Sequence, residues 1–579
     1  MQVIWTDEEP IKLPWLVAGA VCLKKKEYIV RIMKRNILKI TPLGGLGEVG
    51  RNCMVYEYGE NILVVDSGLM FPENDMLGVD YIIPDFTYLV QNRSKVRGII
   101  ITHGHEDHTG ALPHLLAEVQ APIYSTPLTQ GMLEVKLAKH GLAQKADLRT
   151  VHAGETINIG PFKVHLFHVC HSIPDGVGLG IETPAGMIIH SSDYKFDHTP
   201  VDGWPSDYAR LAELSRGGVL ALLADSTNAE RPGWTPSEKV VDAALNRVFD
   251  RAPGRIIIAS FASLISRMQQ VAAVAESHGR KLAFVGTSMQ DNVKIARKLG
   301  YLKFPDSLVV SIEQALNLPP AEVAIMVTGS QGEPTSILGR LSTTRNRLFD
   351  VVPGDTIVLS SHPIPGNEEN VYRTINRLFA LGADVIYEAI APVHVSGHAS
   401  QEEMKLLLHL TRPQFVVPVH GELRHLKQHA LLAQQVGVPA ENIAVIENGQ
   451  SIEFVDGAMK LGGRVPTPYV FVDSSGVAGI SEDVMREREK LSQDGVVMVG
   501  VVVDRFTGRM MQAPNIRMFG FSANGETDAI TAGIQKRVEG VLQRNGSGSP
   551  ERDMEKDIST YLYSETHRRP VVFVSFNKV

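Results

Sequence analysis

The stretch VRGIIITHGHEDHTGALPHLLAEV, residues 96–119, carries the strongest structural signal in this chain. Its first seven residues form a short apolar run that is typical of a buried strand, and the segment after the polar loop is typical of a helix. The loop between them contains His103, His105, Asp107 and His108 within six positions. Because an extended loop can direct alternate side chains the same way, His103 and His105 are placed to share one metal ion. Asp107 and His108 then turn toward a second ion.

Further metal donors follow later strands. His171 follows the strand KVHLFHV by two positions, and Asp193 ends the strand GMIIHSSD. Either residue alone is more often structural, but together with the first cluster they complete a dinuclear site. His420, in the turn VVPVHGE, is the remaining candidate ligand. Nitrogen and carboxylate donors without thiolates suit zinc or manganese.

The composition is that of an ordinary globular protein. The chain has 579 residues, of which 44% are hydrophobic and 21% charged, and these values exclude wholesale disorder. Its 3 cysteines include no C-x-x-C pair, which excludes a disulfide framework and a zinc site made of four cysteines, and favours a reducing compartment. The net charge of −7 excludes a surface coated uniformly with basic residues but not a local basic groove.

Residues 1–36 are predicted to be a poorly ordered extension. The apolar run Leu13–Leu23 is interrupted by Pro14 and is shorter than the ~20 residues that span a bilayer. Acidic residues precede this run, whereas a secretory signal peptide begins with basic ones. We therefore expect a cytoplasmic protein without a membrane segment.

The order of strands and helices predicts several domains. Short strands between turns, with some intervening helices, indicate a sandwich of sheets and helices over residues 37–230, and the same pattern returns over 386–464. Between them, residues 231–385 alternate helices with strands, which predicts an inserted domain with a parallel sheet. A linker is expected at 465–487, and a small α+β domain at 488–579.

Two glycine-rich segments and one cysteine have competing interpretations. Residues 45–50 fit the dinucleotide-binding pattern G-x-G-x-x-G, but that fold needs a helix after the glycines, and a strand is predicted instead, so a turn near the metal site is favoured. Residues 328–332 lack the Gly-Lys-Ser/Thr of a nucleotide P-loop and are expected to form a strand-end turn, or in context to line a substrate channel. Cys170 is expected to be a buried apolar side chain.

Several long motifs resemble the metallo-β-lactamase superfamily, its nucleic-acid-processing β-CASP branch and, within that branch, the bacterial ribonuclease J family. The resemblance covers about residues 37–579 and implies a metallo-β-lactamase αββα sandwich, an inserted parallel-sheet β-CASP domain and a small α+β C-terminal domain. The matching segments, in chain order, are LGGLGEVGRN, VDSGLMFPE, ITHGHEDHTGALP, HSIPDG, SSDYKFD, LLADSTNAERPG, VTGSQGEP, SSHPIPGNE, VHVSGHAS, PVHGE and THRRPVVFV.

The resemblance implies a role for each metal donor. One Zn²⁺ would be held by His103, His105 and His171, and a second by Asp107, His108 and His420, with Asp193 bridging the two. Manganese is the alternative metal. Asp66 would lie behind the ligands and fix the loop that carries the histidines.

The β-CASP branch implies further site residues. His398 would give a proton to the leaving oxygen, and Asp225 would orient it. The residues expected to contact phosphate are His394, Val395, Ser396, Gly397 and His398. Some members of the family bind an additional divalent ion, and the matching positions here are Gly78, Asp80 and Asp473.

The implied function is hydrolysis of RNA phosphodiesters by a hydroxide activated between two zinc ions. Family members degrade single-stranded RNA from 5′ to 3′, also cut internally and leave 5′-phosphates, which implies a role in mRNA decay and rRNA processing. The C-terminal domain is expected to form a homodimer or homotetramer. The alternatives are a DNA nuclease of the same branch and a small-molecule metallohydrolase. The latter is disfavoured because an insertion of some 150 residues is unnecessary for a small ester.

Overall fold

The computed structural model describes residues 37–579, except 74, 365, 474, 475, 478–480, 522–526 and 545–548. The predicted N-terminal extension therefore lies outside the described residues. The described chain forms two compact units, one containing residues up to Phe71 and Ile82–Val470, and the other Pro72–Tyr81 and Phe471–Val579. The residue bounds predicted for individual domains stay a prediction.

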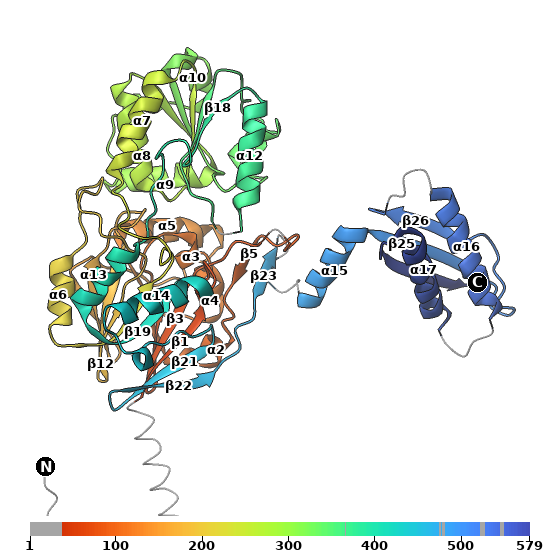
Figure 1. Ribbon diagram of the computed structural model, residues 1–579, viewed down its shortest axis with the longest axis horizontal. Helices are drawn as coiled ribbons and strands as arrows, with labels where there is room; N and C mark the ends of the chain where they lie inside the picture. Colours follow the sequence, from red (N-terminus) through yellow and green to blue (C-terminus); the bar gives the residue numbers. More distant parts are fainter. Residues whose placement is uncertain are drawn as a thin grey trace, which may run out of the picture. The chain divides into compact units, whose positions relative to one another are not determined.

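Two sheets form the centre of the first unit (Figure 1). The first sheet has the order β22-β21-β1-β3-β4-β6-β7-β8. Its strands are β1 (Leu38–Gly44), β3 (Cys53–Tyr58), β4 (Asn61–Val65), β6 (Val96–Ile100), β7 (Ile123–Ser125), β8 (Leu148–Thr150), β21 (Gln450–Val455) and β22 (Ala458–Arg464). The second sheet has the order β19-β13-β12-β11-β10-β9. Its strands are β9 (Thr156–Ile159), β10 (Phe162–His168), β11 (Val177–Thr183), β12 (Gly186–His190), β13 (Val219–Asp225) and β19 (Pro413–Val419).

The hydrophobic core of this sandwich lies between the two sheets. Leu38 and Leu63 of the first sheet pack in one cluster with Leu166 and Leu179 of the second. Strand β13 lies between β12 and β19 and is buried at every residue, which explains its continuous apolar sequence VLALLAD.

Helices form the outer layers of the sandwich. The parallel pairs β6–β7 and β7–β8 are joined through α4 (Leu112–Glu118) and α5 (Pro127–Lys139), because parallel strands need a crossover connection. Helices α6 (Tyr208–Ser215), α13 (Gln401–Thr411) and α14 (Leu423–Gln435) pack against the second sheet in a separate apolar cluster.

The inserted region folds as a five-stranded parallel sheet with helices on both faces (Figure 1). Its strand order is β15-β16-β14-β17-β18, with bounds Lys281–Val285, Val323–Val327, Ile256–Ala259, Thr356–Leu359 and Asp384–Ile386. One face carries α7 (Lys239–Arg251), α8 (Ile265–Ser277) and α9 (Thr287–Lys298). The other carries α10 (Ile312–Leu316), α11 (Ile337–Ser342) and α12 (Glu368–Ala380).

The second unit contains a three-stranded sheet of order β26-β25-β27, with bounds Asn515–Phe519, Val496–Val503 and Val571–Lys578. Helices α16 (Thr527–Gln543) and α17 (Pro550–Thr566) cover one face of it. The segment expected to be a linker contains strand β23 (Val470–Asp473) and the start of helix α15 (Glu482–Asp494).

The predicted fold class, an αββα sandwich with an inserted parallel-sheet domain and an α+β C-terminal domain, is confirmed. Among the helices described here, none combines the length and the apolar character that crossing a bilayer requires.

Candidate metal centre and active site

The predicted site residues lie where strands of the two central sheets end. The segment from His103 to His108 follows β6 and runs into the short helix α3 (Glu106–Thr109), and Asp225 is the last residue of β13. His420 directly follows β19, and Asp193 follows β12 by three positions. Because β12, β13 and β19 are parallel neighbours, their carboxyl ends meet at one edge of the sheet. Residues separated by more than three hundred positions are thereby brought together.

A glycine lets two loops approach closely behind the metal donors. The backbone N–H of Ser67 donates to the carbonyl of His108 at 2.9 Å, and that of Asn52 donates to the carbonyl of Asp107 at 3.0 Å. A Cβ atom on Gly68 would lie 1.5 Å from the Asp107 carbonyl oxygen. Only glycine fits this position, so the sequence VDSGL is required for the histidine loop to lie where it does.

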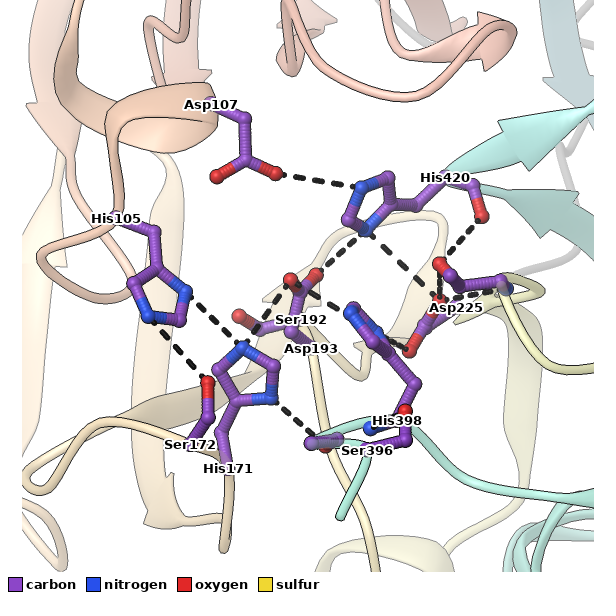
Figure 2. A network of polar contacts seen from close by, with 12 residues as sticks. His105, Asp107, His171, Ser172, Ser192, Asp193, Asp225, Ser396, His398 and His420 are labelled. Carbon is purple, nitrogen blue, oxygen red and sulfur yellow. Dashed lines mark hydrogen bonds and ion pairs between the residues drawn. The ribbon is translucent and has the colours of Figure 1, made fainter. Parts of the chain in front are cut away.

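The first donor group contains three histidines and one aspartate. Figure 2 shows three of its members, His105, His171 and Asp193. Nδ1 of His105 lies 3.1 Å from Nε2 of His103 and 3.1 Å from Nε2 of His171. Oδ2 of Asp193 lies 3.7 Å from Nε2 of His103 and 3.6 Å from Nε2 of His171. Three ring nitrogens and a carboxylate oxygen thus converge on one point.

The second donor group shares Asp193 with the first. Oδ2 of Asp107 lies 3.4 Å from Nε2 of both His108 and His420. Oδ2 of Asp193 lies 3.3 Å from Nε2 of His108, and its Oδ1 lies 2.7 Å from Nδ1 of His420. One carboxylate therefore faces both groups, which is the position that a bridging ligand takes.

The donor atoms fit a divalent cation. Within each group they all lie within 4.8 Å of one another, and all but those of His105 and Asp107 belong to buried residues. Nε2 of His420 is buried and has no hydrogen-bond partner among the described residues, although it faces Asp107. Imidazole nitrogens that point at one another and at carboxylates are satisfied together by a cation between them.

Burial and neighbouring charges set the protonation of the donors. Burial lowers the pKa of His103 and His171, and that of His105 to about 4, which favours the neutral form that binds metals. Burial opposes ionisation of Asp193, but His108 and His420 hold its pKa well below the usual range. In turn Asp193 raises the pKa of His420 to about 10, against the effect of burial.

Asp66 orients the histidines from behind. Its Oδ1 accepts a hydrogen bond from the backbone N–H of Thr102 at 2.8 Å, and its Oδ2 lies 2.8 Å from Nδ1 of His108. Asp66 has a positive φ of 65°, which is unfavourable for a residue other than glycine and is typical of functional sites. Asn52, whose Nδ2 lies 3.1 Å from Nε2 of His108, was missed by the sequence analysis, because nothing in GRNC distinguishes it from a turn residue.

The half-buried His398 and the buried Asp225 form a pair beside the metal donors (Figure 2). Nδ1 of His398 lies 2.8 Å from Oδ2 of Asp225 and 4.0 Å from Oδ2 of Asp193. Burial opposes the charged imidazole, but Asp225 raises the pKa of His398 above its ordinary value. The imidazolium form is therefore stabilised next to the site.

The loop that carries His398 also supports a metal donor. The carbonyl of Gly397 lies 2.7 Å from Nδ1 of His171, so it accepts a hydrogen bond from that ring and fixes its orientation. Asn228 donates to Oγ of Ser396 at 2.8 Å and to the carbonyl of His398 at 3.0 Å. Asn228 was also missed, since its partners lie about 170 positions away.

The remaining residues of the expected phosphate-contacting stretch are mostly engaged within the protein. Val395 is buried, and the backbone N–H of His398 donates to Oγ of Ser396 at 3.2 Å. Nδ1 of His394 is buried without a hydrogen-bond partner in the described part of the chain, and burial lowers the pKa of His394 to about 3. His394 is thus a neutral histidine at the base of this loop.

The positions expected to bind an additional divalent ion lie in the second unit. Nη1 of Arg488 donates to the carbonyl of Gly78 at 3.2 Å, and Nη2 lies 3.7 Å from Oδ2 of Asp473. The backbone N–H of Asp80 donates to the carbonyl of Val472 at 2.8 Å. An arginine from α15 therefore stands beside two of the three positions. The additional ion stays a prediction.

The competing sequence interpretations are resolved by local structure. The glycine segment 45–50 contains the short strand β2 (Leu46–Gly47) and is followed by β3, not by a helix, as predicted. Cys170 is buried, and burial raises the pKa of its thiol to about 11, so it is an inert side chain.

The fold and the donor groups define a hydrolase of the metallo-β-lactamase superfamily, whose family model matches residues 46–195. Three further models match: the ribonuclease J β-CASP domain over residues 253–378, the Zn-dependent metallo-hydrolase RNA specificity domain over 382–444, and the ribonuclease J C-terminal domain over 483–579.

Whole-chain comparison gives the same family. The ribonuclease J of Synechocystis sp. is 42% identical over 553 residues, which cover 93% of this chain and 86% of that protein. The ribonuclease J of Thermus thermophilus is 46% identical over 469 residues, 80% of this chain and 82% of its own length. Ribonuclease J2 of Bacillus subtilis is 39% identical over 541 residues, 92% of this chain and 97% of its own. The chain belongs to the ribonuclease J family and is a metal-dependent nuclease.

A solved structure of a protein of unknown function from Enterococcus faecalis matches 72% of this chain and all of its own, with a TM-score of 0.52 at 15% identity. This likeness concerns the fold alone.

Proposed function

We propose that this protein is a zinc-dependent ribonuclease that degrades single-stranded RNA from 5′ to 3′, also cuts internally and leaves 5′-phosphates. The observation that carries the proposal is the shared Asp193 carboxylate between two donor groups, with the His398–Asp225 pair beside it. The names of the relatives support RNA as the substrate.

The chain supplies two sets of metal ligands. His103, His105 and His171 would hold one ion and Asp107, His108 and His420 a second, and Asp193 would contribute to both groups. A bound pair of divalent cations would neutralise phosphate charge and lower the pKa of water toward ~7. Nitrogen and carboxylate donors suit zinc, with manganese as the alternative.

His398 would supply the proton that the leaving 3′-oxygen needs. Its Nδ1 faces Asp225, so the proton available to the substrate is on Nε2. Asp225 keeps the ring charged at neutral pH because it raises the pKa of His398. The loop of residues 394–398 would lie against the phosphate, with Gly397 providing close backbone approach.

The second unit would assemble two or four copies of the chain. Its sheet is covered by helices on one face, while Met498, Phe519 and Phe573 are 42%, 55% and 54% exposed. Met498 pairs with Phe573, and both side chains lie on the uncovered face. A second copy would bury these side chains. In sedimentation, Phe573→Glu is expected to give a smaller species, and an unchanged oligomer would contradict this role.

The cellular role that follows is mRNA decay and rRNA processing in the cytoplasm. It rests on the family resemblance. A DNA nuclease of the same branch is the competing function, because no described contact reads a 2′-hydroxyl.

The proposal is tested with RNA carrying a 5′-monophosphate or a 5′-triphosphate, and with DNA of the same sequence. Wild type, His103→Ala and the control His409→Ala, whose histidine is exposed on α13, are compared for metal content and cleavage. We expect rapid loss of the monophosphorylated RNA and slow loss of DNA, with metal and cleavage reduced in His103→Ala alone. Equal hydrolysis of DNA, or full activity of His103→Ala, would contradict the proposal.

A further inference from the structure

Four buried charged side chains connect the sandwich to the inserted domain. Lys195, Asp197, Glu238 and Arg267 have side chains that are 5% exposed or less. Nζ of Lys195 lies 3.6 Å from Oδ2 of Asp197 and 3.5 Å from Oε1 of Glu238. Nη2 of Arg267 donates to Oε2 of Glu238 at 2.7 Å. These four side chains, here called the charged row, comprise two positive and two negative groups, so their formal charges cancel.

Arg267 holds the start of the loop that carries His398. From helix α8, its Nη1 donates to the carbonyl of Val393 and to Oγ of Ser360. The Ser360 hydroxyl donates to the same Val393 carbonyl at 2.7 Å. One guanidinium therefore joins Glu238, strand-end residue Ser360 and the root of the loop.

The other end of the charged row lies in the segments next to two metal donors. Lys195 lies two positions after Asp193, and its backbone N–H donates to the carbonyl of Cys170 at 2.8 Å. Cys170 directly precedes His171. The row thus extends from the segments that carry two metal donors to the loop that carries the proton donor.

Buried ion pairs contribute little net stability to a folded protein. Desolvation offsets much of their attraction, and well-packed apolar residues of similar volume often stabilise a protein as well or better. A guanidinium differs from apolar side chains because its planar fork fixes several acceptors at once. Arg267 is 0% exposed, so it does not contact RNA from solvent. Its contacts are geometric constraints on the loop.

We propose that Arg267 is a positioning residue that sets where His398 stands relative to Asp225 and Asp193. Through the Val393 carbonyl it fixes the root of the loop, and the loop in turn presents His398 and the Gly397 carbonyl that orients His171. The proposal rests on the proposed function, because His398 is the proton donor there.

The test uses Arg267→Lys in the full chain. A lysine keeps the charge beside Glu238, but a single ammonium cannot hold Glu238, Ser360 and the Val393 carbonyl together. Since misplacement by about 1 Å can cost ~10²-fold, we expect single-turnover RNA cleavage to fall about 100-fold. The matched control is Arg280→Lys, a buried arginine of the same domain that donates to the carbonyls of Gly254 and Ala252, far from the loop in sequence.

A double-mutant cycle separates positioning from general damage. At saturating metal in the His398→Ala background, Arg267→Lys is expected to cause no further loss beyond about 2-fold, because both changes then act on one proton transfer. Losses that multiply would overturn the proposal, as would wild-type cleavage by Arg267→Lys. If Arg267→Lys does not fold, Ser360→Ala, which removes a single anchor of Val393, is expected to lose activity several-fold with the same dependence on His398.

Hydrogen exchange gives a second readout that needs no activity. In metal-free protein, Arg267→Lys should raise amide exchange in a peptide covering residues 393–398, whereas Arg280→Lys should not. Unchanged exchange in this peptide would overturn the anchoring. Failure of wild type to cleave RNA would instead contradict the proposed function, and the exchange result would still stand.

Discussion

Replacement of Gly397 by alanine is predicted to disturb the metal centre and the proton donor together. A Cβ atom at this position would lie 2.6 Å from Nδ1 of His171 and 2.9 Å from the backbone nitrogen of Ser172. Ordinary contacts begin at 3.4 Å, so the loop must retreat by about 0.8 Å. The hydrogen bond between His171 and the Gly397 carbonyl, now 2.7 Å long, would stretch to about 3.5 Å, the limit for such a bond.

These displacements are expected to lower both the metal affinity and the rate of RNA cleavage. Loss of a partner that orients a metal-bound histidine typically lowers metal affinity 10- to 100-fold, equivalent to about 1.4 to 2.8 kcal/mol. Retreat of the loop also moves His398, so we expect cleavage to fall about 100-fold even when metal is saturating.

The assay combines zinc affinity, from competition with a chelator, and cleavage of 5′-monophosphate RNA at saturating zinc. Gly463→Ala is the control, because a Cβ atom there would meet nothing within 4 Å. If Gly397→Ala binds zinc and cleaves RNA as tightly and as fast as wild type, the coupling of this loop to His171 and His398 is refuted.

Three other outcomes are expected. His398→Ala should keep its metal, measured by elemental analysis, but lose about 10²- to 10⁴-fold in cleavage, and normal cleavage would show that another group donates the proton. Asp225 raises the pKa of His398, and a proton donor loses activity as pH rises through its pKa. In Asp225→Asn the alkaline fall of the pH–rate profile should therefore move to lower pH, and an unmoved profile would contradict the pairing. RNA affinity should fall with salt with a logarithmic slope of about −0.7 per phosphate contacted, whereas an affinity independent of salt would exclude a local basic surface on this acidic chain.

Local spacing made much of the site predictable. Alternation along an extended loop placed His103 and His105 together. Asp193 and His420 lie close to these histidines because they follow parallel strands whose carboxyl ends share one edge of the sheet. The helix–strand alternation of the inserted domain was equally clear, because its central strands β14 and β16 are continuous apolar runs. These features depend on neighbours in sequence or on regular sheet geometry.

Other features depend on contacts that no local pattern contains. Asn52 and Asn228 are ordinary turn residues until the fold places them against His108 and His398. No strong local pattern marks the strand β26, because its five residues alternate between exposed and half-buried side chains. Helix α15 begins inside the predicted linker. The Gly and Ser residues that precede it are typical of a linker, so the sequence did not indicate where the helix begins.

The central claim is that seven side chains from distant positions bind a pair of divalent ions. Anomalous diffraction at the zinc edge, from crystals of zinc-loaded protein, tests it most directly. The account predicts two peaks, each about 2.0–2.2 Å from its histidine nitrogens and carboxylate oxygens, with Asp193 contacting both. A single peak, or two peaks of which neither contacts Asp193, would contradict it.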